Sequence, residues 1–342
     1  MIKRRLRWPI LAAGILGASA MVHAPAHAAQ QAASIDYDFV ARPAGLPADF
    51  AAPAGGSLKF LAITAIDGNR IDAALWQPEG TPAAATALVV SVHGSGANFT
   101  KPPIGFLGAG LVGKGYASLA INTRQHDDRV NTDNFFDVRR DIEAAVYTAR
   151  ALGYRALVLH GHSLGNIQVQ YYAANNWDAD IRAVILTGAF ANLPWKSRHL
   201  LMQNEDNFRA LADAAAKALR EGKVDDVLTV RMRWLGGQEV PVTARHFLTY
   251  RAEASSAADG TYWIRRVPRP ILLARDDGDA FVQAFEPIML LSAATGAGSL
   301  VPSIKYVPLP NPNPPSAAAH GFVDNKQALV DTLAAWLAEL HL

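Results

Sequence analysis

Hydrophobic and polar positions follow two different periods along this chain. Short runs without polar alternation lie at residues 87–92, 116–122, 156–159, 183–186 and 270–274. Such runs are typical of strands that are buried on both faces, as in a parallel sheet. Apolar residues recur at helical spacing over residues 133–152, 167–174 and 329–340. Strands that alternate with helices predict an α/β fold with a doubly wound, mostly parallel sheet flanked by helices.

Two segments before the first of these strands have a different pattern. Residues 29–56 are rich in alanine, proline and glycine and predict an extended N-terminal arm. Residues 58–66 and 70–76 flank Asp67-Gly68-Asn69, which is typical of a β-hairpin. We therefore expect the α/β domain to occupy residues 57–342, with the hairpin at its start.

About 80 residues separate the strand that ends near Thr187 from the strand that begins near Pro270, too many for a simple crossover. Within them, Asn204-Glu205-Asp206 opens a helix that Gly222 closes. Its apolar stripe consists of Phe208, Leu211, Ala215 and Leu219. We expect the insertion, about 191–262, to form a helical lid over a site, and a peripheral element without substrate contact is the alternative.

The first 28 residues predict a signal peptide. Four basic residues between positions 3 and 7 precede an apolar run over 8–22 and the small-x-small sequence Ala26-His27-Ala28. Export to the periplasm or the medium follows from this prediction. An uncleaved membrane anchor is the alternative, although the run is short for a span and contains Pro9. The pair Arg4-Arg5 leaves the Sec and twin-arginine routes both open.

Composition narrows the chemistry. Half of the 342 residues are hydrophobic and 18% are charged, which indicates a folded protein with a large core. Removal of the leader takes away four basic residues and moves the formal net charge from +2 to −2, so no basic surface for nucleic acid is expected. There are no cysteines, which excludes disulfides, thiolate catalysis and cysteine metal sites. After cleavage no other segment is apolar enough to span a membrane.

A Gly-x-Ser-x-Gly pentapeptide lies where a buried strand meets a helix. Residues 161–165 read Gly-His-Ser-Leu-Gly, after the apolar run 156–159 and before the helical stretch 167–174. A strand, a sharp turn and a helix form the context in which this motif presents a nucleophilic serine. We therefore predict that Ser163 is a catalytic nucleophile. A glycine-rich turn with an incidental serine is the alternative, and His162 is expected to be a packed residue of the turn.

A serine hydroxyl is a weak nucleophile and needs a base that a carboxylate orients. If the chain order is serine, acid, histidine, only His320 and His341 follow at a sufficient distance. His341 is the penultimate residue, whereas His320 lies in a loop before the last helix. We expect His320 to be the base because such a loop can reach the end of the sheet.

The acid is expected just after the strand that ends at residue 274. Asp276, Asp277 and Asp279 all follow it closely. Asp279 is the first choice because the chain turns back into structure directly after it, Asp277 is the second and Asp276 the third. The two aspartates that are not used are expected to be solvated turn residues.

Hydrolysis of an ester passes through a tetrahedral oxyanion that needs aligned N–H donors. The N–H of Leu164 is the first expected donor. The second is expected from the loop His93-Gly94-Ser95-Gly96, with Ser95 favoured over Gly94. His93 itself is expected to be a structural hydrogen-bonding residue.

These motifs together resemble the α/β-hydrolase superfamily over about residues 58–190 and 263–340. The resemblance implies that loop 93–96 forms the oxyanion hole, that Ser163 lies on the nucleophile elbow, and that the acid after residue 274 and His320 complete a triad. It also implies a cap where the insertion lies. Two features differ from the family's pattern: Arg275-Asp276-Asp277-Gly278 replaces a His-Gly pair before the acid, and the proline-rich loop that begins at Pro308 is longer than usual.

The sequence thus predicts an exported serine hydrolase that cleaves carboxylic esters, prefers short acyl chains and needs no cofactor. Peptidase, thioesterase, lipase or polyester hydrolase activity, an acyltransferase with the same triad, and a non-catalytic binding protein on the same fold stay open. A small ester is the expected partner, and the oligomeric state is not predicted. His126-Asp127-Asp128 is a weak metal candidate because adjacent residues point in different directions, so no metal is expected.

Overall fold

The computed structural model of the chain describes residues 34–234 and 237–342, which belong to one structural unit. The predicted signal peptide, residues 1–28, lies outside the described residues. Within the described part, no helix combines the length and apolar character that crossing a membrane requires.

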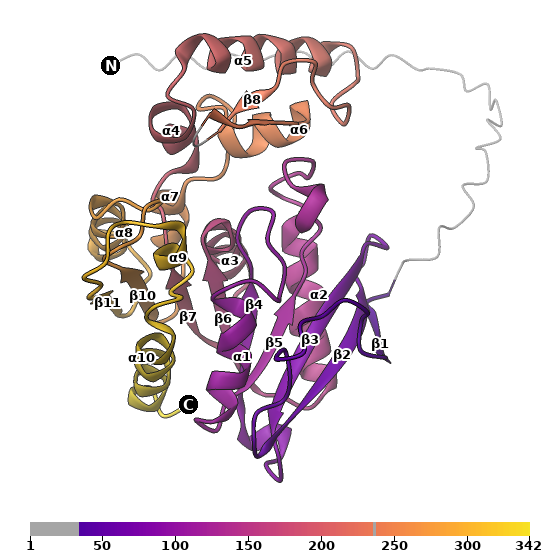
Figure 1. The fold of residues 1–342 in the computed structure, drawn as a ribbon, viewed down its shortest axis with the longest axis vertical. Coiled ribbons are helices and arrows are strands. Elements are labelled where there is room, and N and C mark those ends of the chain that lie inside the picture. Colours follow the sequence, from indigo (N-terminus) through magenta and orange to yellow (C-terminus); the bar gives the residue numbers. More distant parts are fainter. Residues whose placement is uncertain (1–33, 235–236) are drawn as a thin grey trace, which may run out of the picture. The chain divides into compact units, whose positions relative to one another are not determined.

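A nine-stranded sheet forms the centre of this unit, in the order β1-β2-β3-β5-β4-β6-β7-β10-β11 (Figure 1). The strands are β1 (Asp36–Val40), β2 (Gly56–Thr64), β3 (Arg70–Pro78), β4 (Ala87–Val92), β5 (Ala117–Ile121), β6 (Ala156–His162), β7 (Ile181–Thr187), β10 (Ile271–Asp276) and β11 (Ile304–Leu309). From β5 to β11 all neighbours are parallel, whereas β1, β2, β3 and β5 pair antiparallel. The mostly parallel sheet predicted from the sequence is confirmed.

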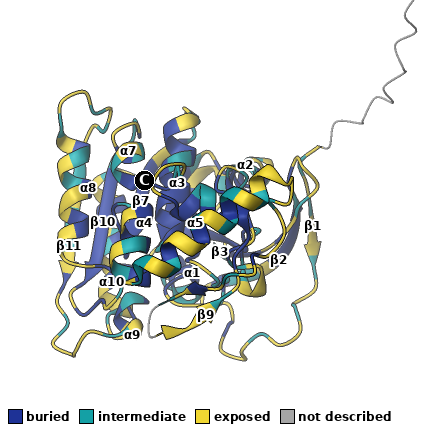
Figure 2. Ribbon diagram, turned by 90° about the horizontal axis from the view of Figure 1, so that it is seen from above, coloured by how far each residue is buried: buried dark blue, intermediate teal, exposed yellow. Residues whose placement is uncertain are grey.

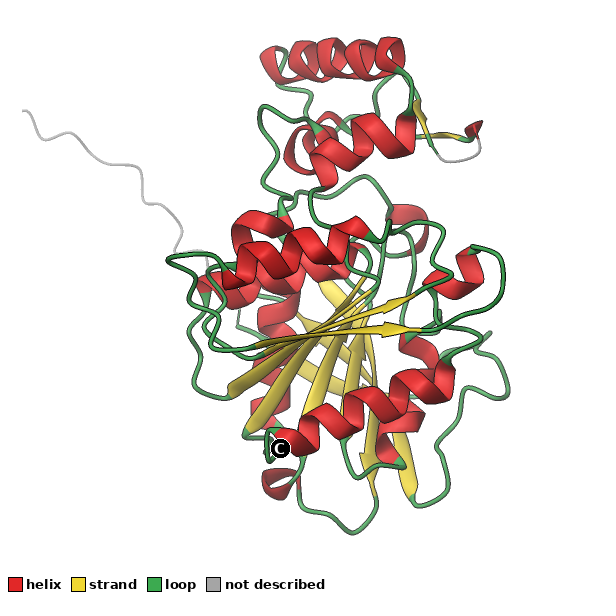
Figure 3. Ribbon diagram, turned by 90° about the vertical axis from the view of Figure 1, so that its left-hand side faces the viewer, coloured by secondary structure: helices red, strands yellow, loops and turns green. Residues whose placement is uncertain are grey.

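Helices cover both faces of the sheet (Figure 3). They are α1 (Ile104–Val112), α2 (Val138–Ala151), α3 (Leu164–Asn175), α8 (Phe285–Thr295), α9 (Ala317–His320) and α10 (Lys326–Glu339), with short 3-10 turns η1 (Ala83–Ala85) and η2 (Asp127–Arg129). Strand β4 shows why its sequence has no polar alternation: Leu88 and Val90 pack into the core under α2 and α3, while Val89 packs into the core under α1 and α10. Figure 2 shows the buried strands between helices whose outer sides are exposed.

The insertion between β7 and β10 is mainly helical. It contains α4 (Leu193–Lys196), the π-helix η3 (Ser197–Met202), α5 (Glu205–Arg220), β8 (Met232–Arg233), β9 (Glu239–Val240), α6 (Ala244–His246), the π-helix η5 (Phe247–Arg251) and α7 (Gly260–Ile264). As expected, Asn204 caps α5, and its side chain accepts a 2.8 Å hydrogen bond from the N–H of Asn207. The insertion has its own hydrophobic core. Of the predicted stripe, Phe208, Leu211 and Ala215 are buried in this core, but Leu219 is 58% exposed.

A separate apolar cluster joins the insertion to the sheet domain. Leu193 and Tyr250 of the insertion pack there with Phe135, Leu164 and Ile167 of the domain. Figure 1 shows the insertion beyond the end of the sheet at which α9 also lies. The chain enters the insertion from the carboxyl end of β7, so the insertion lies on the side where parallel strands of an α/β sheet present binding residues.

Several boundaries differ from the sequence predictions. The N-terminal arm is not wholly irregular, because Asp36–Val40 forms an edge strand against β2. Helix α2 begins at Val138 and not at Asp133, whose carboxylate accepts hydrogen bonds from Tyr250 and His246 of the insertion. Pro308 belongs to strand β11 and not to the loop, which is possible because an edge strand leaves N–H positions without a partner.

The predicted hairpin is confirmed, whereas the loop predicted around His320 is wrong. The hairpin pairs β2 with β3 so that Thr64 lies opposite Arg70. His320 lies at the end of the single-turn helix α9 and not in an irregular loop. Helices α1 and α8 and strand β11 were not expected from the sequence, since their apolar positions have neither a clear helical period nor a run of buried strand residues.

Candidate active site

Ser163 lies at a strained turn between β6 and α3. Its φ of 53° and ψ of −119° are rarely adopted by a residue with a side chain. The turn needs both flanking glycines, since a Cβ on Gly161 would lie 2.4 Å from the carbonyl oxygen of Gly165. A Cβ on Gly165 would in turn lie 2.4 Å from the carbonyl oxygen of Val92. The packing of this turn therefore accounts for both glycines of the pentapeptide.

His320 and Asp279 are in direct contact. The Nδ1–H of His320 donates to Oδ2 of Asp279 over 2.8 Å. The other carboxylate oxygen of Asp279 accepts the backbone N–H groups of Phe281 and Val282, at 2.8 and 2.9 Å. Burial alone raises the pKa of Asp279, but the hydrogen bonds from His320 and from these N–H groups outweigh it and keep the pKa below its usual value. Asp279 is therefore an ionised carboxylate directed at the imidazole.

The other two aspartates have different surroundings. Asp277 is half-exposed and lies 3.4 Å from the guanidinium of Arg275. Asp276 is fully buried, and its carboxylate accepts hydrogen bonds from the side chains of Asn311 and Asn325 at 3.0 and 2.8 Å. Asp277 is thus a solvated turn residue, as expected, but this expectation is wrong for Asp276. The carboxylate of Asp276 instead links the end of β10 to the segments before and after α9.

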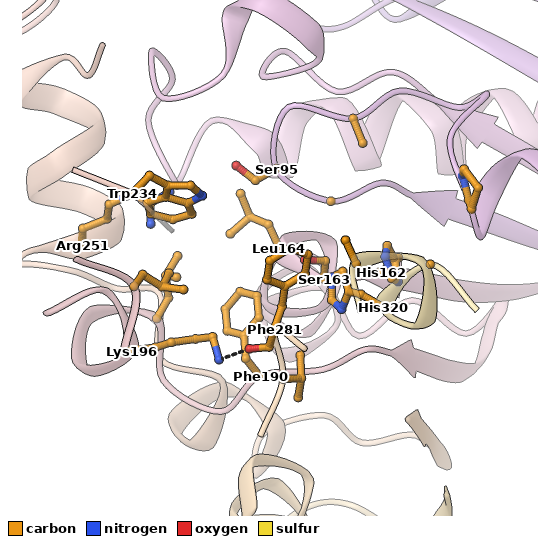
Figure 4. Close-up of a pocket in the computed structure, with 18 of the residues that line it drawn as sticks. Ser95, His162, Ser163, Leu164, Phe190, Lys196, Trp234, Arg251, Phe281 and His320 are labelled. Atoms are coloured by element: carbon orange, nitrogen blue, oxygen red, sulfur yellow. Dashed lines mark hydrogen bonds between the residues drawn. The ribbon is translucent and has the colours of Figure 1, made fainter. Parts of the chain in front are cut away.

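His320 shares a cavity with Ser163, and Figure 4 shows both side chains at one end of it. The ring of Phe281 packs edge-on against His320 at 5.1 Å between centroids. The ring of His162 lies 4.8 Å from His320 on another side, and its Nδ1 is 3.2 Å from Oγ1 of Thr187. Burial, together with the nearby His320, lowers the pKa of His162 well below its usual value. His162 is therefore a neutral, packed neighbour of the imidazole, as its place in the turn predicts.

The loop after β4 approaches Ser163 closely. A Cβ on Gly94 would lie 2.9 Å from Cβ and 3.3 Å from Oγ of Ser163. Gly94, Ser95 and Leu164 all line the cavity beside the serine. Leu164 is the first residue of α3, a position whose N–H has no partner within the helix. The structure thus brings the three residues expected around an oxyanion to the serine.

His93 holds this loop in place. It is fully buried; its Nδ1–H donates to the carbonyl of Gly94 over 2.7 Å and its Nε2 accepts the N–H of Thr123 over 3.0 Å. Burial lowers the pKa of His93 to about 4, so the ring is neutral near pH 7. A neutral ring with one donor and one acceptor fits both contacts.

The comparisons with known proteins agree with this geometry. A model of the alpha/beta hydrolase family matches residues 89–332. The chain belongs to the alpha/beta hydrolase family. No curated protein matches the sequence of this alpha/beta hydrolase significantly.

Several solved structures share the fold of this alpha/beta hydrolase. Est1E from Butyrivibrio proteoclasticus with ferulic acid bound is 18% identical, covers 80% of this chain and 96% of its own, and has a TM-score of 0.60. The esterase domain of a Rhodothermus marinus protein is 22% identical, with 82% and 97% covered and a TM-score of 0.53. A carboxyl esterase from Bacillus coagulans is 14% identical, with 83% and 99% covered and a TM-score of 0.59. At these identities the likeness shows the fold alone.

The cavity of this alpha/beta hydrolase has a volume of about 360 Å³ and a mainly apolar wall. Phe190 and Phe281 line it near the serine and histidine. The insertion contributes Leu193, Lys196, Leu201, Trp234 and Arg251.

The sequence did not point to Lys196 or Arg251. Both are buried in the wall of the cavity, although lysine and arginine in a helical insertion are usually solvent-exposed. Their neighbours in the sequence gave no signal for this. His246, in contrast, is buried against Asp133 and does not line the cavity. Among the described residues, no group of three or more histidine or carboxylate side chains is arranged to hold a metal.

Proposed function

We propose that this alpha/beta hydrolase cleaves carboxylic esters through an acyl-enzyme on Ser163. The observation that carries the proposal is the hydrogen bond from Nδ1 of His320 to Asp279, in a cavity that the strained Ser163 also lines. Because Nδ1 carries the proton, Nε2 of His320 is left as an acceptor for the serine proton. The similar structures include an esterase domain and a carboxyl esterase, which supports an ester as the substrate.

The proposed reaction uses each of these residues. Oγ of Ser163 attacks the acyl carbon while Nε2 of His320 takes its proton, and the carbonyl oxygen becomes an oxyanion held by the N–H groups of Leu164 and Ser95. The ester C–O bond then breaks, and His320 gives the proton to the departing alcohol. Water adds to the acyl-enzyme with His320 again as the base, and the acid leaves as Ser163 regains its proton. Asp279 stabilises the imidazolium in both halves.

The proposal is tested with a series of short 4-nitrophenyl esters and the mature protein, residues 29–342. We expect Ser163→Ala to lose at least about 10³-fold in kcat and a fluorophosphonate to label Ser163, located by mass spectrometry. Fastest turnover of short acyl chains is expected from a cavity of about 360 Å³. An unlabelled Ser163, together with turnover that is absent or survives the substitution, would overturn the proposal and favour a binding protein on this fold.

We also propose that the insertion acts as the lid of this site, since five of its residues line the cavity. If the insertion closes over substrate, the backbone amides of residues 191–262 should exchange hydrogen more slowly when the fluorophosphonate occupies Ser163. Unchanged exchange there would mean a fixed wall.

Export is a separate proposal. The sequence of residues 1–28 supports cleavage before Ala29. Mass spectrometry of the protein recovered from a bacterial periplasm or medium should find Ala29 at the N-terminus. An intact N-terminus in the membrane fraction would instead indicate an anchor.

A further inference from the structure

The charges around the cavity are unbalanced. Lys196 and Arg251 place two cationic side chains in its wall, and none of the described residues that line it is an aspartate or a glutamate. Figure 4 shows Arg251 and Trp234 at the opposite end from His320. A cavity lined by one sign of charge attracts ligands of the other sign. Which of the two cations is available to a ligand depends on its partners.

Lys196 is already neutralised. Its ammonium donates to Oε1 of Glu286 and, over 2.6 Å, to the carbonyl of Phe281. The lysine and glutamate side chains are 3% and 2% exposed. Glu286 also accepts the N–H of Gln283 over 2.9 Å. Lys196 therefore belongs to a closed ion pair that fixes the insertion to the start of α8 and the segment before it, and it contributes little net charge to the cavity.

Arg251 has no such partner. Arg251 is 1% exposed. Within residues 34–234 and 237–342, no carboxylate lies within 4.0 Å of its guanidinium nitrogens. Nη1 donates to Oγ of Ser197 over 3.1 Å, and Nη2 donates to Oδ1 of Asn131 over 3.2 Å. Nε has no partner among the described atoms. A guanidinium has five N–H groups, so neutral acceptors hold it in position without cancelling its charge.

The carboxylate whose charge reaches Arg251 is that of Asp133, and both of its oxygens are occupied. Oδ1 lies 3.0 Å from Nδ1 of His246, and Oδ2 accepts the hydroxyl of Tyr250 over 2.6 Å. Trp234 lies over the guanidinium, with the ring centroid 4.4 Å from Cζ. Arg251 is thus held from three sides at the cavity wall while its own counter-charge is missing.

We infer that Arg251 binds a carboxylate of the substrate, so that the ester cleaved at Ser163 carries a negatively charged group. This inference rests on the proposed ester hydrolysis and narrows its substrate class. A carboxylate matches the planar fork of a guanidinium and would supply the missing counter-charge. Burial lowers the pKa of Arg251 to about 10, which still leaves it cationic at neutral pH.

A purely structural role predicts a different outcome. Ser197 belongs to the insertion and Asn131 to the sheet domain, so Arg251 also links the two. If that were its whole role, removing its charge would affect all esters alike. Substrate recognition instead predicts a loss restricted to anionic esters.

The test compares two 4-nitrophenyl esters of nearly the same shape: the monoester of glutaric acid, which is anionic, and the 5-methylhexanoate, which is neutral. We expect the wild-type protein to favour the anionic ester at least tenfold in kcat/KM. Arg251→Met should lower kcat/KM for the anionic ester at least tenfold, mainly through KM, and for the neutral ester less than threefold. Arg251→Lys keeps the charge and should retain part of the preference.

Arg233→Met is the matched control. Arg233 is exposed, precedes Trp234 in the chain and lies 3.6 Å from Glu239, so its removal changes the net charge equally without altering the cavity wall. It should leave the preference unchanged. A second substrate, the acetate ester of 4-hydroxybenzoate, carries the carboxylate on the alcohol side. Comparing the two anionic esters shows whether Arg251 binds a carboxylate on the acyl side or on the alcohol side.

Binding without turnover provides an independent measurement. Glutarate titrated calorimetrically into Ser163→Ala should bind at least tenfold more weakly once Arg251→Met is added. Equal losses on both esters, or a wild-type protein without preference for either anionic ester, would overturn the role of Arg251 while leaving ester hydrolysis intact. No hydrolysis of either ester by the wild-type protein would instead refute the proposed function.

Discussion

The imidazole of His320 and the carboxylate of Asp279 lie 2.8 Å apart although 41 positions separate them in the chain. An isolated bridge between Asp279 and Ser316, the residue that caps α9, holds the two segments together. The N–H of Ser316 also donates to the carbonyl of Gly278 over 2.8 Å. The orientation of His320 is therefore set by backbone contacts as well as by the carboxylate.

The first prediction concerns the choice of acid. Asp279→Asn should lower kcat by about 10³ to 10⁴-fold, because an amide stabilises the wrong tautomer of His320 and no longer stabilises its cation. Steady-state kinetics on a neutral 4-nitrophenyl ester measure the loss. Asp277→Asn is the matched control, since Asp277 is half-exposed and contacts Arg275, and it should stay within threefold of wild type. Comparable losses in both variants would refute the assignment.

The second prediction concerns the loop beside the serine. Gly94→Ala places a Cβ 2.9 Å from Cβ of Ser163, so either the loop or the serine must move. We expect kcat to fall by about 10² to 10³-fold, the usual effect of losing one oxyanion donor, with a smaller effect on KM. Gly113→Ala, whose new Cβ would meet only a carbonyl oxygen at 3.5 Å, should be nearly silent. An active Gly94→Ala protein would contradict the proposed oxyanion site.

The third prediction concerns the buried pair of Lys196 and Glu286. Lys196→Met leaves a buried carboxylate without its cation and should lower the free energy of unfolding by about 3–5 kcal/mol. Adding Glu286→Gln should recover a large part of this loss. Urea denaturation of both single variants and the double variant measures the coupling.

The control for that pair is exposed. Lys305 lies 2.7 Å from Glu339, with both side chains about half-exposed, and Lys305→Met should cost less than about 1 kcal/mol. If Lys196→Met were as mild as Lys305→Met, the buried pair would not stabilise the link between the insertion and the sheet domain.

The fourth prediction concerns acid stability. The pKa of His93 is about 4 in the folded protein and near 6.5 when unfolded, so the unfolded chain binds an extra proton between these values. The contribution of His93 to the free energy of unfolding is therefore nearly constant above about pH 6.5 and falls as the pH drops toward 4. This one residue should cost about 2 kcal/mol at pH 5.

Urea denaturation at pH 7, 6 and 5 measures this slope. His93→Asn removes the titrating ring and should flatten the decline by the same amount, although the variant starts from a lower stability because its contacts with Gly94 and Thr123 change. An unchanged slope in His93→Asn would show that other groups cause the acid sensitivity.

Much of the fold follows from local sequence. Strand β4 has the predicted bounds, residues 87–92, because all six of its residues are buried and only a strand with helices on both sides buries such a run. The turn at Ser163 follows equally directly, since the space on either side of the serine admits glycine alone. In both cases the determining contacts lie between residues whose positions the local pattern already implies.

Other features depend on contacts between distant segments. Asp133 has the pattern of a helix start, yet its carboxylate binds Tyr250 and His246 of the insertion, and α2 begins later. Strand β11 has no strong local pattern and is stabilised by pairing with β10. At both places tertiary contacts, and not the local helix or strand propensity, determine the secondary structure.

The sequence by itself determined the α/β class, the turn that carries Ser163 and the small set of residues from which the site is built. The sequence ranked Asp279 ahead of Asp277 and Asp276, but only the tertiary structure shows which of the three contacts His320, because three aspartates within four positions share similar local chemistry and differ in where the turn after β10 directs them. The tertiary structure alone also placed Arg251 in the cavity wall without a counter-charge. The burial of a charged side chain depends on the segments that fold over it, and these come from elsewhere in the chain.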